Sequence, residues 1–310
     1  MTPLGAPAAA DVVCVASWNA DLISKVARPI ARGETLMAGD FSISPGGKGS
    51  NASVAAARQG ARVALLARIG DDDFGRMGMA LWHAEGIDTS HVEQVAGERS
   101  GVAQILVYED GDNSIAVYPG AGSGLGARHA QAAAKLLAGC RVVMASCEVP
   151  AEATLEAFRL ARAAGALTLL NPAPARPLSD EMLALVDVLT PNESELFLLA
   201  GEAHSDSADQ AAARLLGRGA RAVLVTLGAA GCRLYQAGQP PHSIPGRAMA
   251  VRDTIGAGDT FTGALAAALA RGEALPAAMQ WANAAAALSV TRHGAIDGIP
   301  RLADVAALLG

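Results

Sequence analysis

The sequence predicts an α/β protein of three layers (α/β/α), in which a doubly wound, mostly parallel β-sheet lies between two layers of helices. Short apolar runs rich in β-branched residues alternate with helical segments, and this alternation is typical of a parallel sheet with helices on both faces. Two further segments, at about 21–45 and 91–118, fit no strand–helix unit. We therefore expect them to form a small second β-sheet attached to the main one.

Buried strands are expected where apolar, β-branched runs occur. These runs are VVCVAS (12–17), RVALLARIG (62–70), RVVMAS (141–146), ALTLLN (166–171), VDVLTPN (186–192) and RAVLVTLG (221–228). In the second of the two exceptional segments, GVAQILVYED and SIAVY flank a Gly-Asp-Asn turn, which predicts a β-hairpin.

Helices are expected between these strands, and they are recognised by their small and apolar residues and by their ends. The expected helices are KGSNASVAAARQG from Lys48, DDDFGRMGMALWHAEG (71–86), ARHAQAAAKLLAG, AEATLEAFRLARAAG (151–165) and FTGALAAALA. The first ends at Gly60, and the second opens with three acids, which suit the positive end of a helix dipole.

Length and composition fit one large domain over 1–310. The 310 residues are 51% hydrophobic and 17% charged, so the chain can bury a sizeable core. The net charge is −6 without any basic block, which argues against a nucleic-acid partner, because neutralising phosphates requires clustered Lys and Arg. The four cysteines form no CxxC pair, so we expect buried thiols in a reducing compartment.

We expect a cytoplasmic protein that does not associate with a membrane. No run approaches the ~18 apolar residues that a membrane-spanning helix requires. The segment MTPLGAPAAA has no basic region and is interrupted by Pro3 and Pro7, so it does not resemble a signal peptide.

The stretch DTIGAGDTF (253–261) places an acid directly after two glycines at the start of an apolar helix. Gly256 and Gly258 allow backbone N–H groups to converge on one point, and the helix dipole adds positive charge there, so the loop suits phosphate oxygens. Asp259 could take a proton from an incoming hydroxyl, as phosphoryl transfer requires. Taken alone, the motif fits equally well a glycine-rich turn with an acid near a helix N-cap.

Other phosphate-binding motifs are absent from the sequence. GGKGSN has Gly after the Lys, so it fails as a Walker A motif. GxGxxG fails at 120–126 and at 256–261, because the third glycine is missing in each. A dinucleotide-binding protein and a protein kinase are therefore disfavoured.

A second polar group lies near the N-terminus, where WNAD (18–21) ends the first strand and PGGKGSN (45–51) precedes a helix. Ligands of open parallel sheets bind at the carboxyl ends of the strands. The members of this group are Asn19, Asp21, Gly46, Gly47, Lys48 and Asn51. Glu148 ends a later strand on the same side. Such donors and acceptors suit a sugar, although the same residues could serve only in turns and caps.

Taken together, these motifs resemble those of the ribokinase/PfkB family of carbohydrate kinases. The matching motifs are NAD (19–21), GGKGSN (46–51), NPAPAR (171–176), PNESE (191–195), TLGAAG (226–231), DTIGAGDTF (253–261) and NAAAALSVTRHGA (283–295). They occur in the family's order over nearly the whole chain. The resemblance implies an ATP-dependent sugar kinase that phosphorylates D-ribose at O5. Alternatives are a kinase for another sugar or a nucleoside, and a non-catalytic sugar-binding protein on the same scaffold.

The resemblance also implies roles for individual residues. Asp259 would be the base, and Gly256, Ala257 and Gly258 would form the anion hole. The sugar would be bound by Asn19, Asp21, Gly46, Gly47, Lys48, Asn51, Glu148 and Asp259. ATP would be bound by Asn192, Thr226, Gly228, Gly231 and Asn283, and Glu195 would organise Mg²⁺, through water. A monovalent cation, K⁺, would be bound by Asp253, Ile255, Ser289, Arg292 and Gly294, mostly through carbonyl groups. The small sheet would be a lid that closes over the sugar and pairs two subunits into a homodimer.

The sequence departs from the family pattern at three positions. Trp18 stands where a small or aliphatic residue is usual. Residues 120–122 read GAG where GAN is common, so Gly122 replaces an asparagine. Gly298 stands where a serine hydroxyl often lies near the cation. Trp18 and Gln104 could line the sugar pocket, which would change the sugar that is accepted. With Gly298, the expected cation site lacks this hydroxyl.

Overall fold

The computed structural model describes residues 10–201 and 207–310. The expectation for MTPLGAPAAA therefore falls almost wholly outside the described residues. In the described part of the chain, no helix is both long enough and apolar enough to cross a membrane.

The main sheet has nine strands in the order β13-β12-β11-β10-β9-β8-β1-β4-β5. Their bounds are β1 (Val12–Val15), β4 (Val63–Gly70), β5 (Asp88–Val95), β8 (Val142–Ser146), β9 (Leu167–Asn171), β10 (Val188–Leu189), β11 (Ala222–Thr226), β12 (Gly231–Gln236) and β13 (His242–Pro245). The strands from β5 to β11 are parallel, and β12 and β13 add an antiparallel edge. The predicted mostly parallel sheet is confirmed.

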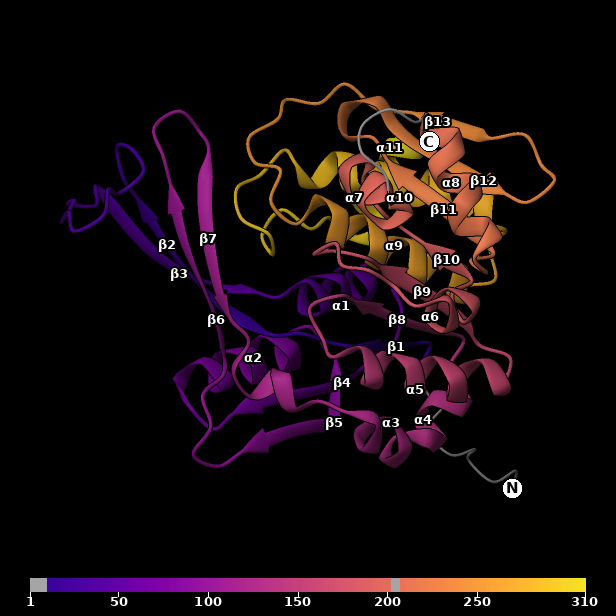
Figure 1. Ribbon diagram of the computed structural model, residues 1–310, viewed down its shortest axis with the longest axis horizontal. Helices are drawn as coiled ribbons and strands as arrows, with labels where there is room; N and C mark the ends of the chain where they lie inside the picture. The colour runs from indigo at the N-terminus through magenta and orange to yellow at the C-terminus, as the bar shows by residue number, and fades with distance from the viewer. Residues whose placement is uncertain (1–9, 202–206) are drawn as a thin grey trace.

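Helices cover both faces of this sheet, which confirms the predicted three layers (Figure 1). One layer holds α1 (Lys48–Arg58), α2 (Asp73–Ala84), α9 (Ala257–Ala270), α10 (Leu275–Ser289) and α11 (Leu302–Leu309). The other holds α3 (Ala127–Ala132), α4 (Ala134–Gly139), α5 (Ala151–Ala163), α6 (Asp180–Ala184), α7 (Glu193–Ala200) and α8 (Ala208–Gly217). Two short 3₁₀ helices are η1 (Gly120–Gly124) and η2 (Gly228–Ala230). Successive residues of β1 face opposite cores, as strand alternation requires.

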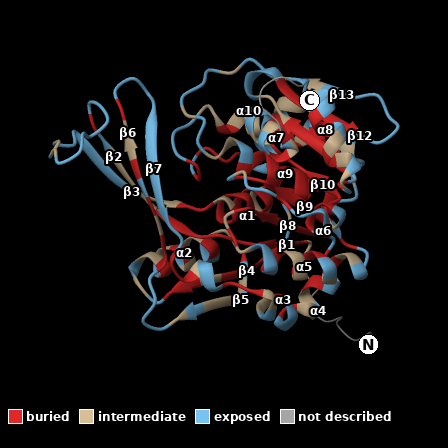
Figure 2. Ribbon diagram, viewed as in Figure 1, coloured by how far each residue is buried: buried red, intermediate tan, exposed pale blue. Residues whose placement is uncertain are grey.

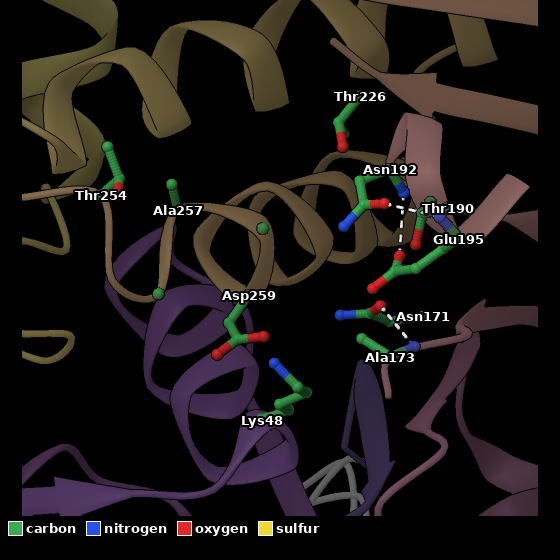
Figure 3. Close-up of a pocket in the computed structure, with 12 residues that line it drawn as sticks. Lys48, Asn171, Ala173, Thr190, Asn192, Glu195, Thr226, Thr254, Ala257 and Asp259 are labelled. Carbon is green, nitrogen blue, oxygen red and sulfur yellow. Dashed lines mark hydrogen bonds between the residues drawn. The ribbon is translucent and has the colours of Figure 1, made fainter. Parts of the chain in front are cut away.

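Helices α1 and α9 pack against each other unusually closely. From Asp259 to Ala270 every residue of α9 is buried. A Cβ added at Gly263 would overlap the carbonyl oxygen of Ala52 on α1. Because the two helices begin at the same edge of the sheet, this packing brings Lys48 close to Asp259 (Figure 3).

The small sheet has four strands in the order β3-β2-β6-β7, and it projects from the main body with all of β7 and the first four residues of β3 exposed (Figure 2). Its strands are β2 (Asn19–Lys25), β3 (Asp40–Gly46), β6 (Gly101–Val107) and β7 (Asn113–Tyr118). The antiparallel pair of β6 and β7 is the predicted hairpin.

The prediction that this sheet begins at residue 91 is wrong. Residues 91–95 belong to β5, which pairs in parallel with β4 at the edge of the main sheet. Strand β5 has the sequence DTSHVEQV, and none of its residues is fully buried. An edge strand of this kind carries no continuous apolar run, so the pattern that identified the other parallel strands is missing.

Candidate active site

A cavity of about 200 Å³ lies where α1, α7 and α9 begin and where β9, β10 and β11 end (Figure 3). Eight of the predicted site residues line it, namely Lys48, Asn192, Glu195, Thr226, Gly256, Ala257, Gly258 and Asp259. Asn171, Ala173, Thr190 and Thr254 complete the wall. The position at the carboxyl ends of parallel strands is the usual ligand site of such sheets.

Asp259 lies in the first turn of α9 and is only 5% exposed. Its Oδ2 accepts a hydrogen bond from Nδ2 of Asn51 at 2.9 Å. Burial raises the pKa of Asp259, while the Lys48 charge and the Asn51 bond oppose this rise. Figure 3 shows the Lys48 ammonium directed toward this carboxylate, and the attraction of Asp259 raises the pKa of Lys48. The site therefore holds a buried carboxylate beside a positive charge.

The start of α9 forms a concave backbone surface. Gly256 is the N-cap residue with φ 75°, a left-handed conformation that favours glycine, and it lies against Ala295. A Cβ added at Gly258 would meet no atom within 4 Å among the described residues. The first N–H groups of a helix lack intrahelical partners, and the dipole is positive at this end. The surface around residues 256–258 is therefore suited to an anion.

A second cavity, of about 260 Å³, adjoins the small sheet. Its polar lining comes from Ser17, Asn19 and Glu148, and the rest of its wall from Trp18, Val117, Pro119, Gly122, Cys147, Val149 and Pro174. Oε2 of Glu148 accepts hydrogen bonds from Oγ of Ser17 (2.6 Å) and from the backbone N–H of Lys48 (2.8 Å). Burial raises the pKa of Glu148. Lys48 thus connects both cavities, because its backbone contacts Glu148 and its ammonium faces Asp259.

Asp21 lies where β2 runs beside the end of β3. A Cβ added at Gly46 would overlap the Asp21 carboxylate, so a side chain at this position would displace that carboxylate. Burial, followed by repulsion from Glu148 and Asp259, raises the pKa of Asp21 to about 7, and Lys48 opposes this. Gly47, with φ 89°, turns the chain into α1. Three carboxylates therefore influence one another around a single ammonium.

Asn192 and Glu195 fix the start of α7 through a capping box. Oδ1 of Asn192 accepts from the backbone N–H of Glu195 (2.8 Å), and Oε2 of Glu195 accepts from the backbone N–H of Asn192 (2.9 Å). Asn192 also forms a parallel β-bridge with Thr226. These side chains and Asn171 lie on one wall of the first cavity (Figure 3). Carboxylate and amide oxygens of this kind are the ligands that Mg²⁺ prefers.

Of the remaining residues of the predicted ATP site, Gly228 and Gly231 lie at the turn between β11 and β12, and Asn283 lies on α10. Gly228 and Gly231 have φ of 55° and 98°. Gly231 pairs with Pro245 of β13, and Nδ2 of Asn283 donates to the Pro245 carbonyl at 3.1 Å. The structure therefore brings Gly231 and Asn283 together at one edge of the sheet, whereas Thr226 lies in the cavity itself.

The predicted cation ligands come from the end of α10 (Ser289) and from two loops, which the Asp253 side chain joins. Its Oδ1 accepts from the N–H of Ile255 and its Oδ2 from the N–H of Gly294, both at 2.9 Å. A Cβ added at Gly298 would lie 2.7 Å from the carbonyl oxygen of Ser289 and 3.0 Å from that of Gly294. Two carbonyl oxygens therefore converge on Gly298. The side chain of Arg292 is exposed, so only its backbone is suited to this site.

Trp18 is a packing residue as well as part of the second cavity wall. Its indole is buried, and Nε1 donates to the carbonyl of Phe74 at 3.1 Å. The ring meets the Trp82 ring edge to face, with 5.4 Å between centroids. A Cβ added at Gly78 would lie 2.8 Å from the Trp18 ring, so a glycine in α2 makes room for this indole.

The expectation that Gln104 lines the sugar pocket is wrong. Gln104 is exposed and pairs with Leu22 across the small sheet. Its neighbour Ala103 pairs with Asp21, and successive residues of a strand face opposite sides. Gln104 therefore points away from the face that carries Asp21.

Several lining residues were not predicted, among them Ser17, Asn171, Thr190 and Thr254. Each lies inside or directly before one of the motifs quoted above. Ser17 directly precedes WNAD, and Thr254 lies inside DTIGAGDTF. Their position in or next to these motifs could have identified them as cavity residues.

Comparison with known proteins agrees with this geometry. Residues 9–302 match the model of the pfkB family carbohydrate kinases. The ribokinase of Haemophilus influenzae is 38% identical, over 92% of this chain and 93% of that protein. The deoxyribokinase of Salmonella typhi is 36% identical, over 94% and 96%. The structure of Arabidopsis thaliana ribokinase complexed with ribose and ATP superposes with a TM-score of 0.91 at 30% identity, over 97% of this chain and 99% of that one. The chain belongs to the pfkB family of carbohydrate kinases.

Proposed function

We propose that the protein transfers the γ-phosphoryl group of ATP to O5 of D-ribose, giving D-ribose 5-phosphate. One observation carries the proposal. The buried Asp259 carboxylate, the Lys48 ammonium and the N-terminus of α9 all face one cavity, beside the polar lining of a second one. The ribokinase names of the relatives and the ribose and ATP in the Arabidopsis complex support the choice of substrates.

In the proposed mechanism, Asp259 takes the proton of the sugar's primary hydroxyl. The oxygen attacks the γ-phosphorus, the bond between that phosphorus and the bridging oxygen breaks, and the electron pair leaves with ADP. N–H groups of residues 256–258 and the α9 dipole stabilise the negative charge on the phosphoryl oxygens. Asn51 holds the Asp259 carboxylate in place through its 2.9 Å bond.

The sugar hydroxyls would be bound by the polar residues on the lid side of Asp259. These are Asn19, Asp21, Gly46, Gly47, Lys48, Asn51 and Glu148. The Asp21 and Glu148 carboxylates accept hydrogen bonds from hydroxyls, and the glycines allow the backbone to approach the sugar. ATP would extend from the first cavity past Thr226 and Gly228 toward Gly231 and Asn283, with Asn192 near its phosphates.

Two cations fit the residues present. Glu195, through water, would hold Mg²⁺, which neutralises charge on the ATP phosphates. The carbonyl groups that converge on Gly298, together with Asp253, Ile255 and Arg292, suit K⁺, an ion that carbonyl oxygens bind well. When bound, K⁺ adds positive field behind the anion hole, because Gly256 lies against Ala295 of the same loop.

We further propose that 1–310 acts as one catalytic domain, with the small sheet as its lid, and that two copies pair through the lids. Phe41 and Ile43 are 57% and 48% exposed on the outer face of this sheet, opposite Asp21. Tyr118 lies on the same face and is also exposed. An apolar face of this kind suits a second copy of the same chain.

A second substrate is favoured by one observation. The cavity beside Asn19 and Glu148 is largely apolar, with Val117, Pro119 and Val149 in its wall. An apolar wall tolerates a sugar that lacks a hydroxyl, and a relative 36% identical to this chain is named deoxyribokinase. 2-Deoxy-D-ribose is therefore the alternative substrate.

The test is ATP consumption in a coupled assay with Mg²⁺, over D-ribose, 2-deoxy-D-ribose, other sugars and nucleosides, each with and without K⁺. We expect the highest kcat/KM for D-ribose and stimulation by K⁺. A higher kcat/KM for deoxyribose or a nucleoside would identify that compound as the substrate and leave the proposed mechanism unchanged. Sugar binding without turnover of any panel member would overturn the kinase proposal.

The role of Asp259 is tested by Asp259→Asn. We expect kcat to fall by about 10²–10⁴, because a positioned base is lost, while the Kd values of sugar and ATP change little. Asp187→Asn is the matched control, since Asp187 is similarly buried but lies directly before β10, where it accepts from the N–H of Thr168. It should lose stability and keep kcat. Near-normal kcat in Asp259→Asn would exclude the assigned role.

A further inference from the structure

A largely buried arginine contacts the chain on both sides of the lid hairpin β6–β7. Arg68 lies on β4 of the main sheet, and its side chain is 11% exposed. Nη1 and Nη2 donate to the two carboxylate oxygens of Glu98, at 2.8 and 2.7 Å. Nη1 also donates to the carbonyl of Ala121 at 2.7 Å. Glu98 precedes β6 and Ala121 follows β7. We call these two ends of the hairpin, at about residues 98–101 and 118–121, its roots, and one guanidinium connects them.

The guanidinium is held in one position by its other contacts. Nε donates to Oε2 of Glu93 at 2.9 Å, and Nε2 of His129 lies 2.8 Å from the same oxygen. A Cβ added at Gly124 would overlap Nη1. A planar group with bonds on three sides and backbone on the fourth has little rotational freedom.

Further bonds fix the two roots to each other and to α2. The N–H of Ala121 donates to the carbonyl of Arg99 at 2.8 Å. The N–H and Oγ of Ser100 donate to the Asp72 carboxylate at 2.9 and 2.6 Å, and Asp72 is the N-cap residue of α2. The hairpin is therefore tied to the main domain up to residue 100 and again from residue 121.

The residues directly beyond these ties shape the sugar side of the site. A Cβ added at Gly101 would overlap Oδ1 of Asn19, so the start of β6 sets the space around that side chain. Val117, Pro119 and Gly122 line the second cavity, on either side of the β7 root. The position of the roots therefore determines the position of one cavity wall.

We propose that Arg68 is a positioning residue for the sugar site. It fixes the points about which β6–β7 can move, at residues 99–101 and 118–120, and so holds the cavity wall and Asn19 in register with the main domain. The proposal deepens the proposed function, because it assigns this network to sugar binding. Arg68 lines neither of the two cavities, and it acts through Glu98 and Ala121.

The test is Arg68→Gln in the full-length protein, with the best sugar of the panel as substrate. If the fraction of molecules whose lid is positioned to bind sugar falls to about a tenth, the apparent Kd and KM for sugar rise about tenfold. The KM for ATP should stay within about twofold, since the ATP residues lie on the other side of Asp259. Arg68→Lys should be intermediate, because an ammonium can keep a bond to Glu98 but cannot span all partners.

Hydrogen exchange provides a readout that does not depend on activity. We expect faster exchange in Arg68→Gln within about residues 99–121, with the main sheet unchanged. Arg218→Gln is the matched control, because Arg218 also joins a carboxylate, that of Asp180, to two backbone carbonyls. Arg218 follows α8, and its partners lie on or beside α6 and α7 rather than next to the lid. It should leave the sugar KM and lid exchange unaltered.

Two outcomes would overturn the proposal. One is an unchanged sugar KM with unchanged exchange over residues 99–121. The other is a similar rise in both KM values with faster exchange throughout the main sheet, which would assign Arg68 to general stability. If the wild-type protein phosphorylates no sugar, the proposed function fails, while exchange and calorimetric sugar binding still decide the role of Arg68.

Discussion

At the scale of single residues, the site is governed by the cost of burying like charges together. Asp21, Glu148 and Asp259 lie around one ammonium, that of Lys48, and burial raises the pKa of each carboxylate. The single positive charge only partly offsets this. In the proposed complex, sugar hydroxyls would donate hydrogen bonds to these acids and stabilise their charges, so part of the stability given up by the free protein would return as affinity.

The first prediction concerns Asp21 and pH. Its folded-state pKa of about 7 lies above the ordinary value of 3.8, so between these pH values the folded state holds a proton that the unfolded state has lost. The stability that this proton contributes is fully present below pH 4 and is lost as pH rises to 7. Asp21→Asn should therefore increase the free energy of unfolding at pH 8 by roughly 2–4 kcal/mol, and by little near pH 4.

Urea unfolding at several pH values between 4 and 8 measures this difference. Asp40→Asn is the control, because Asp40 lies in the same small sheet but is exposed and pairs with Lys25 at the surface. It should change stability by less than about 1 kcal/mol at every pH. A pH-independent effect of Asp21→Asn would contradict the electrostatic explanation.

At the scale of elements, the buried parallel strands and the helices α1, α2, α5 and α9 were predicted, because each carries a continuous apolar or small-residue signal between clear end signals. Helices α6, α7, α8, α10 and α11 were not identified from the sequence. Strand β5 was not predicted either, since its residues are partly exposed at the sheet edge. The β12–β13 edge also lacks such a run. The helix predicted over ARHAQAAAKLLAG is divided into α3 and α4 at Ala133, whose N–H is shared between the carbonyls of His129 and Ala130. Neither Pro nor Gly marks this division in the sequence.

The second prediction compares two glycines of α9 that have the same helix propensity and different surroundings. Gly263→Ala would overlap the Ala52 carbonyl and should destabilise the protein by about 1–3 kcal/mol. Gly258→Ala meets nothing within 4 Å and should stabilise the free protein by roughly 0.5–1 kcal/mol. Its methyl group would occupy the cavity, so kcat should fall by about tenfold or more.

Thermal unfolding and steady-state kinetics on both variants separate the two effects. Gly263→Ala, assayed well below its Tm, serves as the kinetic control, since its methyl group lies between α1 and α9 rather than in the cavity. A normal kcat in Gly258→Ala would argue against an anion hole at residues 256–258.

At the scale of the whole molecule, the identity of many site residues was predictable and their arrangement was not. Lys48, Glu195 and Asp259 were named from local motifs, and the structure places them in one cavity. The bond between Asn51 and Asp259 joins residues 208 positions apart, and no local pattern specifies it. The face on which Gln104 lies depends on the register between β2 and β6, which a single strand does not reveal.

The third prediction concerns assembly through the lid. Replacing Phe41 and Ile43 together by Gln removes exposed apolar side chains from the outer face of the lid. We expect the wild-type protein to have twice the chain mass by light scattering and the variant to be a monomer at the same concentration. Leu198→Gln on α7 removes a still more exposed apolar side chain elsewhere and should leave the mass unchanged. A monomeric wild-type protein would refute pairing through the lid.

The close packing of α1 against α9 also bears on how the protein is made. About 200 residues separate the end of α1 from the start of α9. At translation rates of about 5–20 residues per second, α1 emerges roughly 10–40 s before its partner is synthesised. During that interval the apolar side of α1 that later packs on α9, including Ala52, Ala55 and Ala56, lacks its cover on the ribosome-bound chain. This side of the nascent chain therefore stays open to aggregation until α9 has been translated, and only then can the residues of α1 and α9 that line the first cavity meet.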